Sequence, residues 1–129
     1  MWIKAPDRNL ASWLFRKTKD QFTYKSDGKK DKWKVFTGSE NFSGDCDDFA
    51  MCLGYRFFNA FWVPLFLGKF DLFHVKYNGV GHMMLYCDGY WYDNIMESPT
   101  PAGKLPTAYN GLVHYSPWVV LVNYFIWKR

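Results

Sequence analysis

The segment DCDDFAMCLGYRFFNAF, residues 45–61, decides the fold class and raises the central question of function. Its apolar residues form one stripe with spacings of three or four positions: Phe49, Cys52, Leu53, Phe57 and either Ala60 or Phe61. Such intervals predict a helix with one buried face. Asp45 is a favourable N-cap, so the helix is expected to begin at Cys46, and Pro64 is expected to end it.

Three acids, Asp45, Asp47 and Asp48, surround Cys46 at this helix start. A carboxylate beside a thiol raises the thiol pKa and weakens the sulfur as a nucleophile. At the start of a helix, however, the backbone N–H groups and the helix dipole favour a thiolate and carboxylates alike. Two interpretations stay open: the acids cap the helix and point away from the sulfur, or they hold a cation. In either case a reactive Cys46 needs a base.

A β-hairpin is predicted over residues 81–96, because Asp88–Gly89 is a strong signal for a two-residue turn. Counting outward from the turn places His82 opposite Ile95. Asp93 is then a diagonal neighbour of His82 on the same face of the sheet. Diagonal neighbours lie about 7–8 Å apart along the backbone, and their side chains can meet. A hydrogen bond between His82 and Asp93 is therefore expected.

Together, Cys46, His82 and Asp93 supply a nucleophile, a base and a carboxylate that orients the base. Each residue alone has an ordinary structural explanation, since a cysteine at a helix start is usually inert and a strand histidine usually just makes a hydrogen bond. The combination in this chain order is what favours a catalytic triad. The other cysteines and histidines are poorer candidates for nucleophile and base. Cys52 and Cys87 fall in apolar stretches and are expected to be buried thiols. His74 and His114 have no comparable acidic partner in an evident register.

The remaining elements follow from the same periodicities. They are a helix over residues 6–24, a strand over 70–78, loops over 25–34 and 99–111, and one or two strands over 112–127. Pro117 is expected to interrupt these last strands, and the apolar run 118–127 is interpreted as buried core rather than a contact surface. Helices followed by an antiparallel meander predict the α+β class, with N-terminal helices packed on an antiparallel β-sheet.

Length and composition indicate a single domain over residues 1–129. Apolar residues make up 49% of the chain and aromatic residues 22%, which excludes a largely disordered protein. No run approaches the roughly 18 apolar residues of a membrane span, and no leader of signal-peptide type is evident. The three cysteines form an odd set without a secretory context, so we expect free thiols, cytoplasmic synthesis and no membrane span.

The net charge of +4 is mild, and lysines concentrate in KSDGKKDKWK, residues 25–34. We interpret this segment as a solvated loop rather than a nucleic-acid patch. Aromatic residues interleaved with basic ones would favour single-stranded nucleic acid, but most aromatic residues here fall in apolar runs that are typical of a core. No nucleic-acid partner is expected.

Three blocks of the sequence resemble the motifs of a known family: GDCDDFA (44–50), GHMMLYC (81–87) and GYWYDNI (89–95). The family is that of the bacterial transglutaminase-like cysteine peptidases, which are relatives of papain and transglutaminase. The resemblance implies a papain/transglutaminase-like core with Cys46 as nucleophile, His82 as base and Asp93 as orienting acid. Trp33 is similar to the tryptophan in the family's lead-in to the cysteine.

Some members of this family depend on calcium, so the resemblance makes Asp45 and Asp47 candidate calcium ligands. The triad itself requires no cofactor. Hard cations need six or more oxygen ligands, and the residues alone favour helix capping for Asp45. The Cys46 N–H is one expected donor to an oxyanion. Candidates for the second donor are Asn41, Trp33 and Asn94.

The expected function is cysteine-dependent acyl transfer, in its simplest form hydrolysis of a peptide or amide bond. Candidate substrates are a protein or a peptidoglycan stem peptide. A short chain without the family's export signal suggests a phage-encoded or otherwise mobile protein, which a virion could carry if it is phage-encoded. The alternative is a non-catalytic structural or binding protein, for example a phage virion component, that retains the fold.

Overall fold

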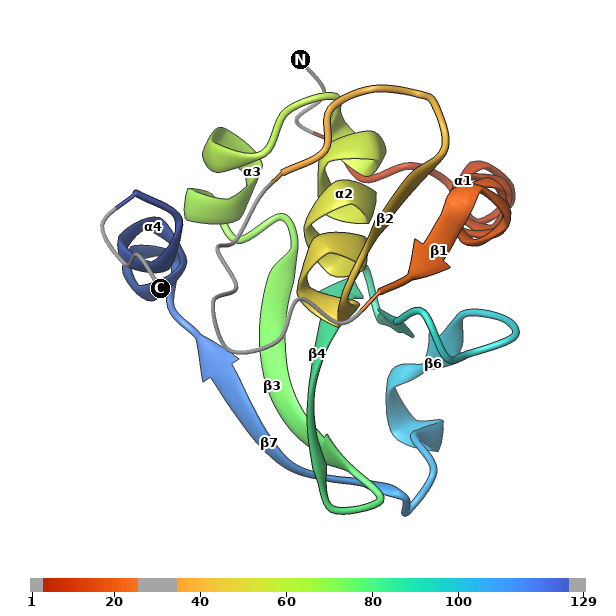
Figure 1. The fold of residues 1–129 in the computed structure, drawn as a ribbon, viewed down its shortest axis with the longest axis vertical. Helices are drawn as coiled ribbons and strands as arrows, with labels where there is room; N and C mark the ends of the chain where they lie inside the picture. Colours follow the sequence, from red (N-terminus) through yellow and green to blue (C-terminus); the bar gives the residue numbers. More distant parts are fainter. Residues whose placement is uncertain (1–3, 26–34, 126–129) are drawn as a thin grey trace.

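The computed structural model describes residues 4–25 and 35–125 (Figure 1). The lysine-rich loop predicted at 25–34, except for its first residue, and Trp33 within it lie outside the described residues. Helices lead into a sheet whose five main strands are antiparallel, which confirms the α+β class. Across the two described ranges, no helix combines the length and apolar character that crossing a membrane requires.

Helix α1 spans Arg8–Gln21 and packs against α2. The carboxylate of Asp7 caps it by accepting a hydrogen bond from the Leu10 N–H at 2.8 Å. The predicted helix extends three residues too far, because Phe22–Tyr24 form strand β1 instead. β1 pairs in parallel with β2, Phe42–Gly44, in a stretch that the sequence predicts as irregular. The aromatic and β-branched residues of β1 suit a strand, but its distant partner leaves no local signal.

Helix α2 spans Cys46–Phe58, as the cap at Asp45 predicts, and lies between α1 and the sheet (Figure 1). Asn59 ends the helix in the left-handed conformation, with φ at 54°. The prediction that Pro64 ends it is therefore wrong. Pro64 lies in the first turn of a separate short helix, α3, Trp62–Phe66, where its missing N–H leaves no helical hydrogen bond unmade.

The main sheet has the strand order β6-β5-β4-β3-β7. Its strands are β3 (Asp71–Tyr77), β4 (Val80–Cys87), β5 (Tyr90–Tyr92), β6 (Thr100–Pro101) and β7 (Tyr109–Tyr115). The β4–β5 hairpin is confirmed, and Asp88 and Gly89 have the positive φ values, 51° and 86°, that a type I′ turn needs. The predicted loop at 99–111 contains β6, a 3₁₀ turn at Ala102–Lys104 and the start of β7.

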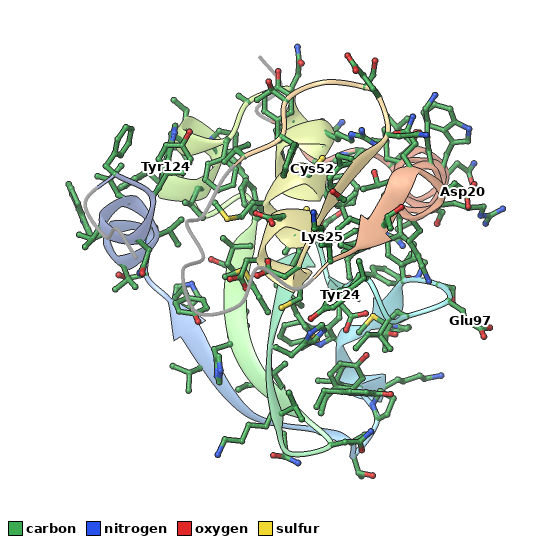
Figure 2. All side chains as sticks on the ribbon, in the orientation of Figure 1. Asp20, Tyr24, Lys25, Cys52, Glu97 and Tyr124 are labelled. Atoms are coloured by element: carbon green, nitrogen blue, oxygen red, sulfur yellow. The ribbon has the colours of Figure 1, made fainter. Side chains whose placement is uncertain are left out.

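The core fills the space between α2 and the sheet, where α2 lies against β4. Its largest fully buried side chains include Phe15, Phe49, Leu53, Phe58, Phe70, Leu72, Leu85 and Tyr92. The approach of α2 to this layer depends on Gly54, since a Cβ there would lie 2.8 Å from the Phe70 ring. Figure 2 shows Cys52 on α2 near the centre of the view, whereas Asp20 and Glu97 lie at the periphery.

The C-terminal segment corrects the prediction of a buried strand. Residues Pro117–Phe125 form helix α4, in which Val120 is fully buried whereas Trp118 and Phe125 are 67% and 58% exposed. Pro117 opens the helix at its first position, and the Ser116 hydroxyl accepts a hydrogen bond from the Val119 N–H at 3.3 Å. An apolar run rich in valine fits a strand or a helix equally well by periodicity alone, so the start signal decides.

Candidate active site

The acids around Cys46 form the start of α2. Asp45 Oδ1 accepts hydrogen bonds from the N–H groups of Asp47 and Asp48 at 3.1 and 3.3 Å, and Asp48 Oδ2 accepts one from the Asp45 N–H at 3.2 Å. This is a capping box, in which two side chains satisfy donors that the helix leaves unpaired. Gly44 allows it, because a Cβ at that position would lie 2.2 Å from Asp48 Oδ2.

The sulfur of half-buried Cys46 lies between its own helix and strand β4. Its thiol donates to Asp47 Oδ1 at 3.5 Å, and it accepts a hydrogen bond from the Met83 N–H at 3.4 Å. That N–H belongs to the peptide that joins His82 to Met83, so the start of α2 contacts β4 at the residue that follows His82. Within the described part of the chain, Cys46 and His82 make no hydrogen bond with each other.

The environment of Cys46 favours the thiol over the thiolate. Burial raises the pKa of Cys46 far above its ordinary value, the Asp47 and Asp45 charges raise it further, and the Met83 N–H opposes them. Of the two sequence interpretations, capping holds for Asp45 and Asp48. The expectation that the acids point away from the sulfur is wrong for Asp47, whose carboxylate contacts it.

The predicted contact between His82 and Asp93 is present. His82 Nε2 lies 2.8 Å from Asp93 Oδ2, and both side chains are buried, with 7% and 0% exposure. His82 belongs to β4, whereas Asp93 follows the last residue of β5. The hairpin thus sets the distance between them, and a carboxylate just past the strand end reaches back to the imidazole.

Asp93 has three further donors that the sequence does not predict. Its Oδ1 accepts hydrogen bonds from the N–H groups of Ile95 and Met96 at 2.9 and 2.7 Å, and its Oδ2 accepts one from the Tyr109 hydroxyl at 2.8 Å. Four donors therefore hold a carboxylate that is fully buried. Burial and the Asp93 charge raise the pKa of Tyr109 above its ordinary value, so Tyr109 remains a hydroxyl donor.

Tyr115 is a second tyrosine near the site that the sequence does not predict, and it lies near Asp47 and Cys46. It is half-buried at the end of β7, and burial followed by the Asp47 and Cys46 charges raises its pKa to about 12. The two tyrosines, Tyr109 and Tyr115, mark the two ends of β7, which pairs with β3 at one edge of the sheet. No local sequence pattern predicts that Tyr109 and Tyr115 lie near the site, because their position depends on which strand β7 pairs with.

The candidate calcium ligands Asp45 and Asp47 make other contacts in this structure. One oxygen of Asp45 already serves the helix cap, and Asp47 contacts the Cys46 thiol. Among residues 4–25 and 35–125, no group of three or more His, Cys, Asp or Glu side chains is arranged to hold a metal ion. A hard cation needs six or more oxygens, so Asp45 and Asp47 would have to be joined by further oxygen ligands.

The candidates for a second oxyanion donor receive little support. Asn41 is exposed, and Trp33 lies outside the described residues. Asn94 follows Asp93 directly and is half-buried, with an Oδ1 atom that is buried without a hydrogen-bond partner. The first expected donor, the backbone N–H of Cys46, suits the role, because the first residue of a helix has no intrahelical acceptor for its N–H.

The surroundings of the other two histidines, His74 and His114, make them poorer candidates for the base than His82. His114 has an acidic partner that no evident register indicates, since His114 Nε2 lies 3.0 Å from Asp71 Oδ1. Those side chains are 45% and 31% exposed, so this is a surface pair of small expected energy. His74 packs against Tyr115, with ring centroids 6.3 Å apart. His82 remains the histidine that combines a buried carboxylate with a position beside Cys46.

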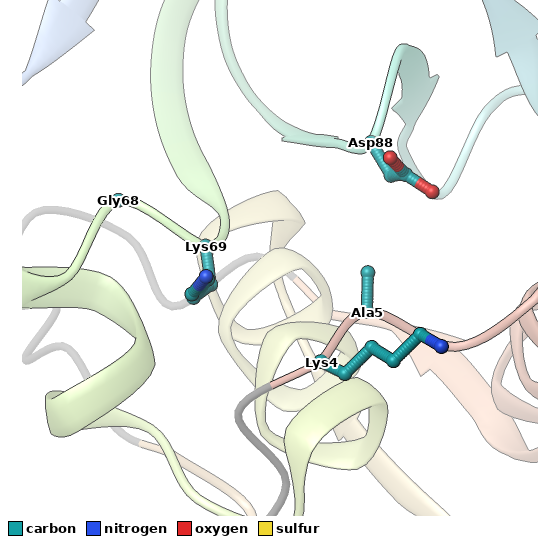
Figure 3. Close-up of a pocket in the computed structure, with 5 residues that line it drawn as sticks. All are labelled: Lys4, Ala5, Gly68, Lys69 and Asp88. Carbon is teal, nitrogen blue, oxygen red and sulfur yellow. The ribbon is translucent and has the colours of Figure 1, made fainter.

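Two of the cavities lined by described residues bear on where the site lies. One of about 300 Å³ lies on the Asp93 side of the site and is lined by Tyr77, Tyr109 and Glu97 among others. A larger one of about 530 Å³ is lined by Lys4, Ala5, Gly68, Lys69 and Asp88 (Figure 3). The larger cavity contains no member of the triad, so size alone does not locate the chemistry.

Comparison with known proteins adds no match: no family model matches the chain, and neither a curated protein nor a solved structure does.

Proposed function

We propose that the protein is a cysteine-dependent acyl transferase that hydrolyses a peptide or amide bond, in the manner of the transglutaminase-like cysteine peptidases. One observation carries the proposal. The buried His82–Asp93 pair, at 2.8 Å, lies directly beside the peptide N–H that contacts the Cys46 sulfur. A nucleophile at a helix start, a base and an orienting carboxylate are then within one small region.

The proposed reaction begins with proton transfer. Asp93 occupies His82 Nε2, which leaves Nδ1 to take the proton from the Cys46 thiol. The thiol must first turn from Asp47 toward the imidazole, a rotation about its Cα–Cβ bond. The sulfur then attacks the carbonyl carbon, and the Cys46 N–H stabilises the oxyanion.

Collapse of this intermediate breaks the carbon–nitrogen bond, and the His82 imidazolium gives its proton to the leaving amine. A thioester on Cys46 remains. Water then attacks the thioester while His82 accepts its proton, and the acid product leaves as the thiol is restored. An amine in place of water gives transamidation with the same residues.

The substrate class follows from the resemblance and not from the site. A protein or a peptidoglycan stem peptide supplies the required amide carbonyl. The net charge of +4 favours approach to an acidic polymer such as the bacterial envelope, and delivery within a phage particle is consistent with that role.

Acetylation by p-nitrophenyl acetate tests the acyl-transfer step without a known substrate. We expect an acetyl group on Cys46, located by peptide mass spectrometry, in the wild-type protein and none at position 46 in Cys46→Ala. In His82→Ala the rate is expected to fall by about 10²-fold or more, the usual contribution of a general base. Equal rates in wild type and His82→Ala would refute the proposal.

A second candidate function is a binding or structural role, for example in a phage virion. It is favoured by an apolar face on α3 and α4, formed by exposed Val63, Phe66, Leu67, Trp118, Val119, Val122 and Phe125. Phe66 and Trp118 join the two helices, with ring centroids 5.0 Å apart. If acetylation proves independent of Cys46 and His82, this role becomes the better account.

A further inference from the structure

Tyr109 contacts the candidate triad from across the sheet and has no part in the mechanism above. It is the first residue of β7, and strand β3 separates β7 from β4, which carries His82. Its hydroxyl donates to Asp93 Oδ2 at 2.8 Å, the same oxygen that lies 2.8 Å from His82 Nε2. Tyr109 is 8% exposed and Asp93 is fully buried, so bulk water competes little for this bond.

The Asp93 carboxylate has every acceptor site in use. Backbone N–H groups of Ile95 and Met96 hold Oδ1, while His82 and Tyr109 share Oδ2. A carboxylate has about four acceptor sites, two on each oxygen. Only one orientation of the carboxylate satisfies all four donors, and Tyr109 supplies one of the two constraints on Oδ2.

The sheet fixes the ring of Tyr109 in place. Tyr109 pairs with Tyr77 in the β3–β7 register, and the two ring centroids are 4.7 Å apart. Both rings also border the imidazole of His82, at 6.2 Å for Tyr77 and 6.3 Å for Tyr109. The hydroxyl therefore reaches Asp93 from a rigid strand and not from a loop.

We propose that Tyr109 is a positioning residue, whose hydroxyl takes one acceptor site of Asp93 Oδ2 and so leaves His82 a single direction in which to bind. The proposed mechanism needs the Nδ1 atom of His82 on the side of Cys46, and the bond to Asp93 decides which way the imidazole faces. The inference rests on the proposed function, because Tyr109 acts through the base. Besides positioning, a neutral donor draws part of the carboxylate charge away from His82, so its removal strengthens the His82–Asp93 bond and favours the imidazolium.

Tyr109→Phe removes the hydroxyl and keeps the ring. An NMR titration of the His82 imidazole is expected to show a midpoint higher by about half a pH unit or more than in wild type. The maximal rate of Cys46 alkylation is expected to fall several-fold, because His82 is less well directed. Replacing Tyr109 with 3-fluorotyrosine, a stronger donor of the same shape, is expected to move the midpoint the opposite way.

Tyr86→Phe is the matched control. Tyr86 lies on β4 with His82, and its ring packs against Trp91 with the ring centroids 4.8 Å apart. Its hydroxyl makes no hydrogen bond to another described residue. In Tyr86→Phe, the midpoint of the His82 NMR titration should equal that of wild type. An unchanged or lowered midpoint in Tyr109→Phe would overturn the role of Tyr109. If wild-type Cys46 alkylation does not depend on His82, the proposed function fails instead, and the titration still reports whether Tyr109 acts on His82.

Discussion

The end of α2 that carries Cys46 and the end of the sheet that carries His82 meet at the Met83 N–H, yet the two regions are built in opposite ways. On the sheet side, four donors at 2.7–2.9 Å hold the Asp93 carboxylate in one orientation. On the helix side, burial and the Asp47 carboxylate raise the pKa of Cys46 and hold it as a thiol.

Under the proposed function, this difference means that His82 must activate Cys46. The acids that cap α2 stabilise the helix, and their negative charge disfavours a thiolate at its first residue. A thiol in such a place gains reactivity only if a neighbouring group takes its proton. In the proposed mechanism that group is His82, which Asp93 already holds in one orientation. The oriented His82 must therefore take the proton of the Cys46 thiol.

The largest expected effect comes from Asp93→Ala, which removes the acceptor of four donors. Buried donors without partners cost about 1–3 kcal/mol each, and we expect the free energy of unfolding in urea to fall by at least about 3 kcal/mol. Glu97→Ala, at a nearby exposed position, is the control and should change stability by less than about 0.5 kcal/mol. Equal losses in the two variants would show that the sheet side is not specially stabilised.

Alkaline pH should weaken the fold through the two thiols outside the triad. Burial raises the pKa of Cys52 to about 11 and that of Cys87 to about 12, against about 8.5 for an ordinary thiol. Between those values the unfolded chain has lost protons that the folded chain keeps, so stability falls as pH rises. The fall is at most about 1.4 kcal/mol per thiol and pH unit.

Urea unfolding at about pH 8 and about pH 10 measures that slope. Cys52→Ala should show a smaller loss between the two pH values than wild type, although its stability at the lower pH is reduced by the lost packing. A slope of zero in wild type would contradict the raised pKa values of these thiols.

Gly44→Ala tests the helix side directly. A Cβ at Gly44 would lie 2.7 Å from the Asp48 Cβ, so the capping box must shift, at an expected cost of about 1–3 kcal/mol in the free energy of unfolding. Gly103→Ala is the matched control, because a Cβ there meets nothing within 4 Å. Thermal unfolding of both variants separates the close approach from the general effect of losing a glycine.

The smallest expected effect is that of Asp47→Asn on Cys46. Removing the carboxylate lowers the pKa of the Cys46 thiol, so its alkylation at neutral pH should speed up by about threefold to tenfold. Asp20→Asn, at an exposed position on α1, controls for the change in net charge. A slower reaction in Asp47→Asn would mean that Asp47 assists the thiol and does not restrain it.

The parts of the site that the sequence predicts have local signals. Asp45 before an apolar helical stripe sets the start of α2, and Asp88–Gly89 sets the turn that brings His82 to Asp93. Both signals depend on residues that are adjacent or within one turn of each other. The position of Cys46 beside β4 then follows from packing the apolar stripe of α2 against the sheet.

The parts that the sequence misses depend on distant partners. Tyr109 reaches Asp93 only because β7 joins the sheet next to β3, and no local pattern specifies that neighbour. The contact of Asp47 with the sulfur depends on a side-chain rotamer within the capped turn. Helix α4 is missed for another reason, since its valine-rich run has strand propensity and the helix start at Pro117 overrides it.

The most direct test of the account follows iodoacetamide alkylation across pH, residue by residue, in wild type and in His82→Ala. Cys52 and Cys87 serve as internal standards in the same molecule. The account predicts that Cys46 reacts well below the pKa of about 8.5 of a free thiol, and that His82→Ala slows it by about 10²-fold or more while the two standards are unchanged. Equal Cys46 rates in the two proteins would contradict it, because the preorganised base would then do nothing for the nucleophile.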